Sequence, residues 1–79
     1  MRKEDLSKFK GKKVTFKKVS SFPDIKIQFV TSFPDYKIKA ADSKSFAVSD
    51  VIKYQEVTSF PDVKLQKVTS FEDIQIYFE

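Results

Sequence analysis

The chain has 79 residues, with no cysteine, no histidine and one glycine. It therefore lacks the side chains that most often form disulfides, transfer protons near neutral pH or bind transition metals. A single glycine also excludes the glycine-rich phosphate loops of nucleotide-binding folds. We expect a protein that is not an enzyme and has no catalytic, cofactor-binding or metal-binding residue.

The formal net charge of +4 comes from the amino-terminal segment. The first 18 residues carry eight Lys or Arg against two acidic residues. Residues 1–12 are predicted to be a basic lead-in, either flexible and solvated or a short helix, because acidic residues come first, lysines follow and Gly11 ends the segment. The candidate contacts for an anionic partner are Arg2, Lys3, Lys8, Lys10, Lys12 and Lys13.

No apolar run in the sequence approaches the roughly 20 residues that a membrane-spanning helix requires. The charged start of the chain is also not followed by the apolar run of a secretory signal. We expect a soluble, cytoplasmic monomer with no membrane partner.

Most of the chain is built from an 11-residue unit with the motif Ser-Phe-Pro-Asp or, once, Ser-Phe-Glu-Asp. Residues 41–56 form a related unit with five extra residues. Internal repeats of this kind indicate a fold made by winding or stacking similar units. The four regular copies are residues 19–29, 30–40, 57–67 and 68–78.

Each unit ends in alternating apolar and polar residues, with β-branched or aromatic side chains at the apolar positions, which predicts a β-strand. Proline in the motif disfavours helix, because it fixes its own φ and restricts the residue before it. We expect an all-β domain over residues 13–79. Its six strands are predicted at about residues 13–19, 25–30, 36–41, 52–57, 63–68 and 74–78.

The aromatic residues of the motif are predicted to lie in the core, because a small domain can hardly expose several large rings. These structural repeat residues are Phe22, Phe33, Phe60 and Phe71. Another aromatic position of the unit is variable, and its rings are expected to be partly exposed and are the candidates for a small apolar contact patch. These two residues are Phe29 and Phe78.

The acidic residue that ends each motif is predicted to be structural as well. Its carboxylate is expected to close its own turn or to pair with the lysine two residues later, rather than to converge with the others on a cation. These residues are Asp24, Asp35, Asp62 and Asp73.

The order of apolar residues raises one structural question. Ile25 and Ile27 share a strand face, whereas Val30, which opens the next unit, falls on the opposite face. The pattern requires either strands that are covered on both faces near one end or a bend in every unit.

The repeat resembles the 7(1) septoil knot family of small bacterial proteins over about residues 14–78. The resemblance rests on the spacing and on the Asp-apolar-Lys-apolar core of Asp24–Ile27, Asp35–Ile38 and Asp62–Leu65, with Gln75 in place of lysine in Asp73–Ile76. It implies a compact all-β domain whose strands wind into a deep seven-crossing torus knot, with no established biochemical function. Short Phe-Pro linkers and the basic segment before residue 14 depart from the family pattern.

The alternative fold is an unknotted β-solenoid or β-prism with two open edges. Four strand lysines would then guard the edges against pairing with other chains. They are Lys26, Lys37, Lys53 and Lys64.

The leading functional hypothesis is a non-enzymatic structural or interaction module that resists unfolding and proteolysis. The alternative is a weak, sequence-nonspecific binder of nucleic acid or acidic surfaces that uses the basic amino-terminal segment. The residues identify no physiological partner.

Overall fold

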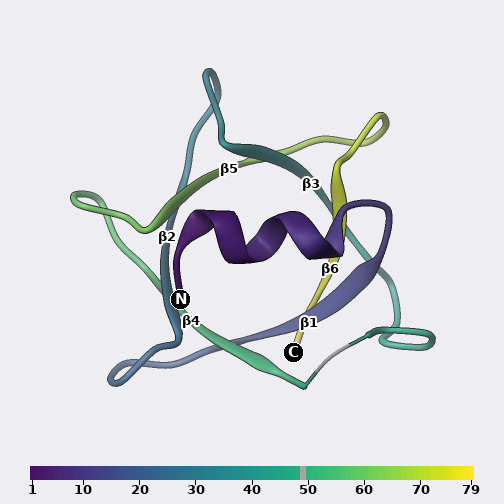
Figure 1. The fold of residues 1–79 in the computed structure, drawn as a ribbon, viewed down its shortest axis with the longest axis horizontal. Helices are drawn as coiled ribbons and strands as arrows, with labels where there is room; N and C mark the ends of the chain where they lie inside the picture. The colour runs from purple at the N-terminus through teal and green to yellow at the C-terminus, as the bar shows by residue number, and fades with distance from the viewer. Residues whose placement is uncertain (49) are drawn as a thin grey trace.

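The computed structural model describes residues 1–48 and 50–79. A 3-10 helix, η1 (Lys3–Phe9), precedes six short strands that form a ring around a common axis (Figure 1). The strands lie within one residue of the predicted ranges, which confirms the strand prediction. They are β1 (Lys13–Lys18), β2 (Ile25–Phe29), β3 (Tyr36–Ala40), β4 (Ile52–Glu56), β5 (Val63–Lys67) and β6 (Ile74–Phe78).

The strands pair in the order β1-β4-β2-β5-β3-β6, and β6 returns to β1 to close a barrel. All six pairings are parallel. Among the described strands, none pairs with its neighbour in sequence and none has a free edge. The all-β prediction is confirmed, the open-edged alternative is wrong, and the strand lysines have no edge to guard.

The hydrophobic core fills the barrel. Neighbouring strands are staggered by two residues, as Ile25 lies opposite Tyr54 and Ile27 lies opposite Val63. Such a stagger tilts the strands and narrows a barrel until side chains fill its interior. Each strand contributes two buried apolar side chains, which are Val14, Phe16, Ile25, Ile27, Tyr36, Ile38, Ile52, Tyr54, Val63, Leu65, Ile74 and Ile76.

The valines that open the repeat units lie directly after β1, β2, β4 and β5. Val30 is half-buried, and its N–H donates a hydrogen bond to the Leu65 carbonyl at 2.9 Å. It therefore extends the ladder of β2 by one residue beyond Phe29. Val30 lies on the strand face opposite to Ile27, where it is only half-buried.

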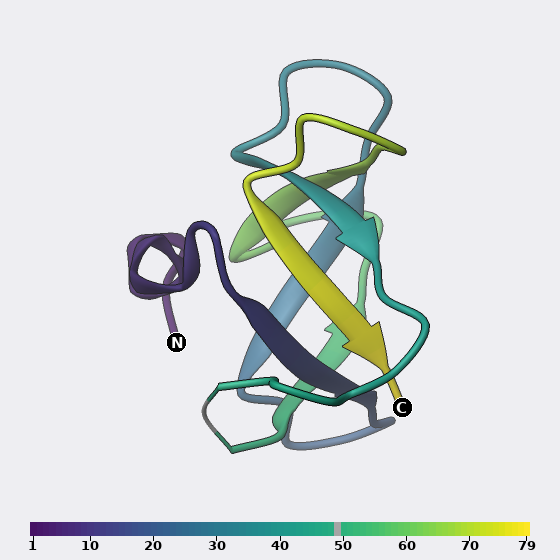
Figure 2. The same ribbon diagram turned by 90° about the vertical axis from the view of Figure 1, so that its right-hand side faces the viewer.

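Helix η1 closes the end of the barrel at which the strands begin (Figure 2). Its Leu6 is 1% exposed and its Phe9 is 6% exposed, so both belong to the core. The chain turns out of the helix at Gly11, whose φ of 77° suits glycine and whose N–H donates to the Asp73 carbonyl at 2.8 Å. Of the two forms considered for residues 1–12, the structure has a short helix at Lys3–Phe9, and its Leu6 and Phe9 are buried rather than solvated.

The linkers carry the chain around the barrel nearly twice. Four six-residue linkers each pass one intervening strand, as residues 19–24 pass β4 between β1 and β2. The linker of residues 41–51 passes two strands, because the Ala41 N–H donates to Ile76 of β6 and the Val48 N–H donates to Lys13 of β1. The extra residues of the divergent repeat unit therefore span one additional strand.

Candidate binding surface

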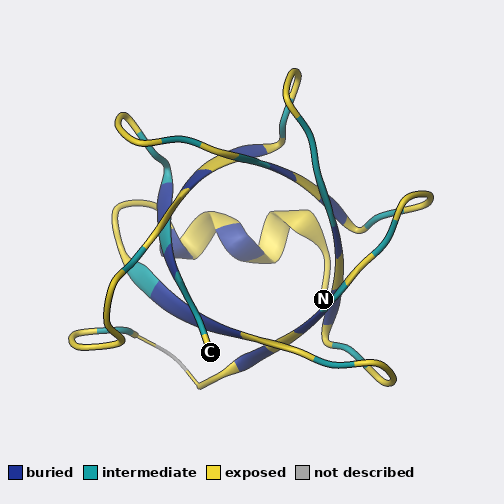
Figure 3. Cartoon of the chain, turned by 180° about the vertical axis from the view of Figure 1, so that it is seen from behind, coloured by how far each residue is buried: buried dark blue, intermediate teal, exposed yellow. Residues whose placement is uncertain are grey.

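Each of the five linkers, which project outward from the barrel (Figure 3), carries one highly exposed phenylalanine. Their side chains are 92–96% exposed, so the prediction that the motif phenylalanines lie in the core is wrong. The barrel interior is already filled by the strand residues, and a linker that crosses the outside of the barrel directs its central residue into solvent. We call these residues the Phe tips: Phe22, Phe33, Phe46, Phe60 and Phe71.

The backbone of every Phe tip is left-handed, with φ between 52° and 65°. For a residue other than glycine this conformation costs about 1–2 kcal/mol. Phe46 belongs to the divergent unit and was not among the predicted repeat residues, although Ser45-Phe46 repeats the Ser-Phe pair of the motif. The Phe tips thus combine an unfavourable backbone with a ring that buries almost no surface.

The motif aspartates tie each linker to the strand that it passes. At Asp24, the backbone N–H donates to the Lys53 carbonyl at 2.8 Å, and the carboxylate accepts a hydrogen bond from the Lys53 N–H at 2.9 Å. The two-residue stagger places these groups opposite each other. The other three pairs repeat both bonds: Asp35 with Lys64, Asp62 with Lys26 and Asp73 with Lys37.

These residues, Asp24, Asp35, Asp62 and Asp73, are called the Asp anchors below. The expectation that each carboxylate serves its own turn or pairs with the lysine two residues later is wrong, because its partner is a backbone amide of another repeat. Across the described ranges, no group of three or more acidic residues is arranged to hold a metal ion.

Asp35→Ala is expected to lower the free energy of unfolding by about 1–3 kcal/mol, because it leaves the Lys64 N–H without its side-chain acceptor. Urea denaturation measures the loss. Asp35→Asn is expected to lose less, because its amide oxygen still accepts this hydrogen bond. Asp42→Ala, at an exposed position of the longest linker, is the control, and an equal loss there would contradict this role for Asp35.

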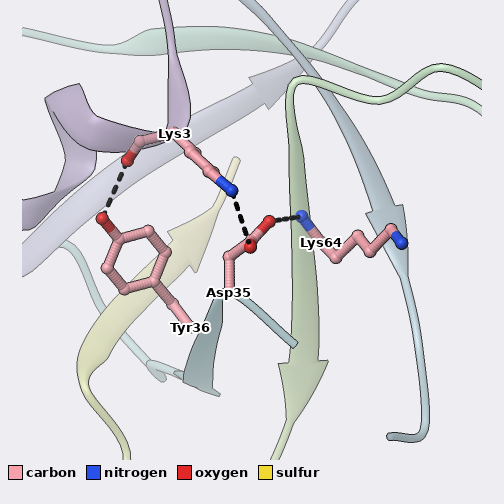
Figure 4. Close-up of polar contacts among 4 residues, drawn as sticks. All are labelled: Lys3, Asp35, Tyr36 and Lys64. Carbon is pink, nitrogen blue, oxygen red and sulfur yellow. Dashed lines mark hydrogen bonds and ion pairs between the residues drawn. The ribbon is translucent and has the colours of Figure 1, made fainter. Parts of the chain in front are cut away.

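A shallow cleft of about 430 Å³ lies beside one Phe tip, between two linkers and the amino terminus of η1. In it, Lys3 Nζ lies 3.4 Å from Asp35 Oδ1, while Asp35 Oδ2 accepts the backbone N–H of Lys64 at 2.8 Å (Figure 4). The lining residues are Arg2, Lys3, Glu4, Phe33, Asp35, Pro61, Asp62 and Lys64.

Tyr36 connects this region to the core. Its hydroxyl donates to the Lys3 carbonyl at 2.8 Å (Figure 4). Burial raises its pKa above the ordinary value of 10.0, and the carboxylates of Glu4 and Asp35 add to the rise. Burial also raises the pKa of Tyr54.

The tyrosines give the fold an alkaline limit. Because the folded state holds the Tyr36 proton more tightly than the unfolded chain, the associated stability is fully present below about pH 10 and is lost as the pH rises from there through the folded pKa. Urea denaturation across this range is expected to show a decline that is shallower in Tyr36→Phe. Identical declines in both proteins would contradict the assignment to Tyr36.

The six predicted amino-terminal cations do not form a separate arm. Lys3 pairs with Asp35, Lys8 Nζ lies 5.2 Å from the centre of the Phe9 ring, and Lys10 Nζ lies 5.6 Å from that of Tyr36. Arg2 lines the cleft beside Phe33. Lys12 is exposed in the turn after η1, and Lys13 begins β1, where its ammonium donates to the Ser45 carbonyl at 2.9 Å.

Phe29 and Phe78 close the end of the barrel opposite η1. They are partly buried against the core, with ring centres 6.2 Å apart, and Phe78 also contacts Phe16 and Tyr54. Lys67 Nζ covers them at 4.4 Å from the centre of Phe29 and 5.6 Å from that of Phe78. These rings serve the core more than the contact patch proposed for them, and the Phe tips are far more exposed.

The sequence matches the family described as the 7(1) septoil knot domain over residues 12–79, which include all six strands. The chain belongs to the 7(1) septoil knot family. This membership confirms the resemblance drawn from the repeat spacing and the Asp-apolar-Lys-apolar core.

A curated relative of the septoil knot chain is an uncharacterized protein, UU089.1, from Ureaplasma parvum serovar 3. The two are 66% identical over 41 residues, which is 52% of this chain and 46% of the relative. The match thus spans about half of the relative's length. In the described part of the chain, no helix is long and apolar enough to cross a membrane.

Proposed function

We propose that this septoil knot protein is a non-enzymatic binding module, in which a rigid barrel presents the Phe tips to a partner. The observation that carries the proposal is the exposure of five rings on left-handed backbone. Burying a Phe side chain stabilises a fold by about 1.5–3 kcal/mol, and the Phe tips forgo nearly all of this. Folding does not explain why phenylalanine stands at these positions, whereas contact with a partner does.

The repeat units themselves support this view. Their last position varies freely among Phe29, Ala40, Glu56 and Lys67, yet phenylalanine stands at the tip of every linker. The Asp anchors hold each of the four six-residue linkers by two bonds to a neighbouring strand, so four of the five rings are presented on an anchored backbone. Preorganised aromatic contacts lose little conformational entropy on binding.

Resistance to unfolding is the second part of the proposal. A seven-crossing knot, as the family description implies, would have to be unthreaded before the chain could lose its structure completely. The module would then keep its tips in place under conditions that unfold ordinary small domains and would resist proteolysis.

Photochemical crosslinking in the native cells tests the binding role. The photoreactive analogue p-benzoylphenylalanine at Phe60 is expected to form covalent adducts with a partner, whereas the same analogue at Lys17, an exposed strand position, is expected to form few. Absence of adducts from all five tip positions would overturn the proposal.

Stability measurements provide the necessary control. Phe60→Gly is expected to keep the free energy of unfolding within about 1 kcal/mol of the wild-type value, because glycine relieves the backbone cost while adding entropy to the unfolded chain. A large loss of stability would show that the ring serves the fold and would remove the reason for the proposal.

A further inference from the structure

The Phe tips are accompanied by cations. Each Asp anchor lies two residues after a tip and is bonded to the backbone of a lysine on the neighbouring strand. These lysines are exposed, and their side chains point outward because the residues on either side of each are buried. The resulting tip–lysine units are Phe22 with Lys53, Phe33 with Lys64, Phe60 with Lys26 and Phe71 with Lys37.

The unit at Phe33 shows how such a pair is laid out. Phe33 and Lys64 line one cleft of about 430 Å³ together with Arg2 and Lys3. The acidic residues of the cleft are Glu4, Asp35 and Asp62, and the last two are already hydrogen-bonded to the backbone amides of Lys64 and Lys26. An aromatic side chain and three cationic side chains therefore line the same cleft.

The linkers that carry the Phe tips project away from the barrel axis on all sides (Figures 1 and 3). A flat partner, such as a bilayer or a broad protein surface, can reach only the tips on one side. A partner that engages the whole set must be a flexible chain that encircles the barrel, whose Cα atoms span 30 × 26 Å in the plane of Figure 1.

The chemistry of the Phe tips and their lysines indicates which class of flexible chain would bind. Exposed aromatic rings stack with unpaired bases, and lysines attract the phosphates between them. A DNA duplex is excluded, because its bases are already paired and its persistence length of about 50 nm prevents it from bending around so small a body.

From these observations we propose that the Phe tips and their lysines bind single-stranded nucleic acid, wound around the outside of the barrel, without sequence preference. This inference rests on the proposed binding role and names the class of partner. The dissociation constant is expected between about 10⁻⁴ and 10⁻⁶ M at physiological salt, as for other nonspecific contacts of this kind.

Fluorescence anisotropy with labelled oligo(dT) and oligo(U) of about 20 nucleotides tests the inference. Replacing all five Phe tips by Ser is expected to weaken binding by about 100-fold or more, and Phe60→Ser alone by about fivefold. Replacing the five tips by Tyr is expected to retain binding, because the phenol ring still stacks. Circular dichroism confirms that each variant is folded.

Two variants that lose the same number of positive charges distinguish the effect of the tip lysines from the effect of the protein's overall positive charge. Replacing Lys26, Lys37, Lys53 and Lys64 by Gln is expected to reduce the slope of log K against log salt by about 3. The same number of charges removed elsewhere, at Lys8, Lys10, Lys12 and Lys17, is expected to change it less. Equal effects of both sets would overturn the role of the tip–lysine units.

Other results would also overturn the inference. They are equal affinity for a duplex of the same length, affinity unchanged by the tip substitutions, or no binding to either oligonucleotide at about 50 mM salt. In the cellular crosslinking experiment, adducts that a nuclease leaves intact and a protease digests would retain the binding role and exclude nucleic acid as the partner.

Discussion

Leu6→Ala is expected to lower the free energy of unfolding by about 2–5 kcal/mol. Leu6 is 1% exposed and closes the barrel end together with Phe9, so truncation leaves a cavity between η1 and the strands. A small domain has about 5–15 kcal/mol of stability in total, which makes this a large fraction. Urea or thermal denaturation of both proteins measures the difference.

Lys8→Ala, on the exposed side of the same helix, is the matched control and is expected to change stability by less than about 0.5 kcal/mol. Similar small effects of both substitutions would show that η1 contributes little to the fold. The expected result also affects a simpler experiment, because deleting residues 1–11 removes Leu6 and Phe9 along with the amino-terminal cations. Loss of nucleic-acid binding after that deletion would therefore not locate the binding residues.

Cutting the longest linker is expected to raise the unfolding rate by about tenfold or more. A protease site inserted after Ser43, in the exposed part of residues 41–51, allows cleavage of the folded protein. We propose that threading of the chain slows unfolding. Cleavage breaks the linker that passes both β6 and β1, so the chain no longer has to be unthreaded past this intact linker. Unfolding in denaturant after rapid mixing measures the rate.

The uncut protein with the same insertion is the control for the added residues. Circular dichroism before denaturation establishes that the cut chain keeps its strands. Equal unfolding rates for the cut and uncut forms would contradict the idea that threading protects the fold.

The strands and the inner face of the barrel follow from local sequence. Alternating apolar and polar residues specify which side chains face inward, as at Ile25, Lys26 and Ile27, whatever partner the strand finds. The Phe-Pro-Asp motif likewise interrupts the strand pattern and so sets where the strands end. Repetition of the unit made the family resemblance visible from residues alone.

The role of the motif could not be read in this way. The prediction of a buried Phe22 assumed that a large ring must enter the core, yet two residues per strand and two from η1 already fill the interior. The partner of Asp24 is Lys53, 29 residues later, and no local rule connects them. A left-handed phenylalanine also carries no signal in sequence, because glycine is the residue that this backbone favours.

The sequence by itself determined that this protein is an all-β repeat domain with six short strands, because strand formation depends on periodicity and on the residues that interrupt it. Only the tertiary structure decided that the sheet closes, that the chain passes over intervening strands, and that η1 seals one end. Those features depend on contacts between residues far apart in the chain. Because of these features, the motif phenylalanines are exposed in the linkers around the barrel and not buried in the core, where they were expected.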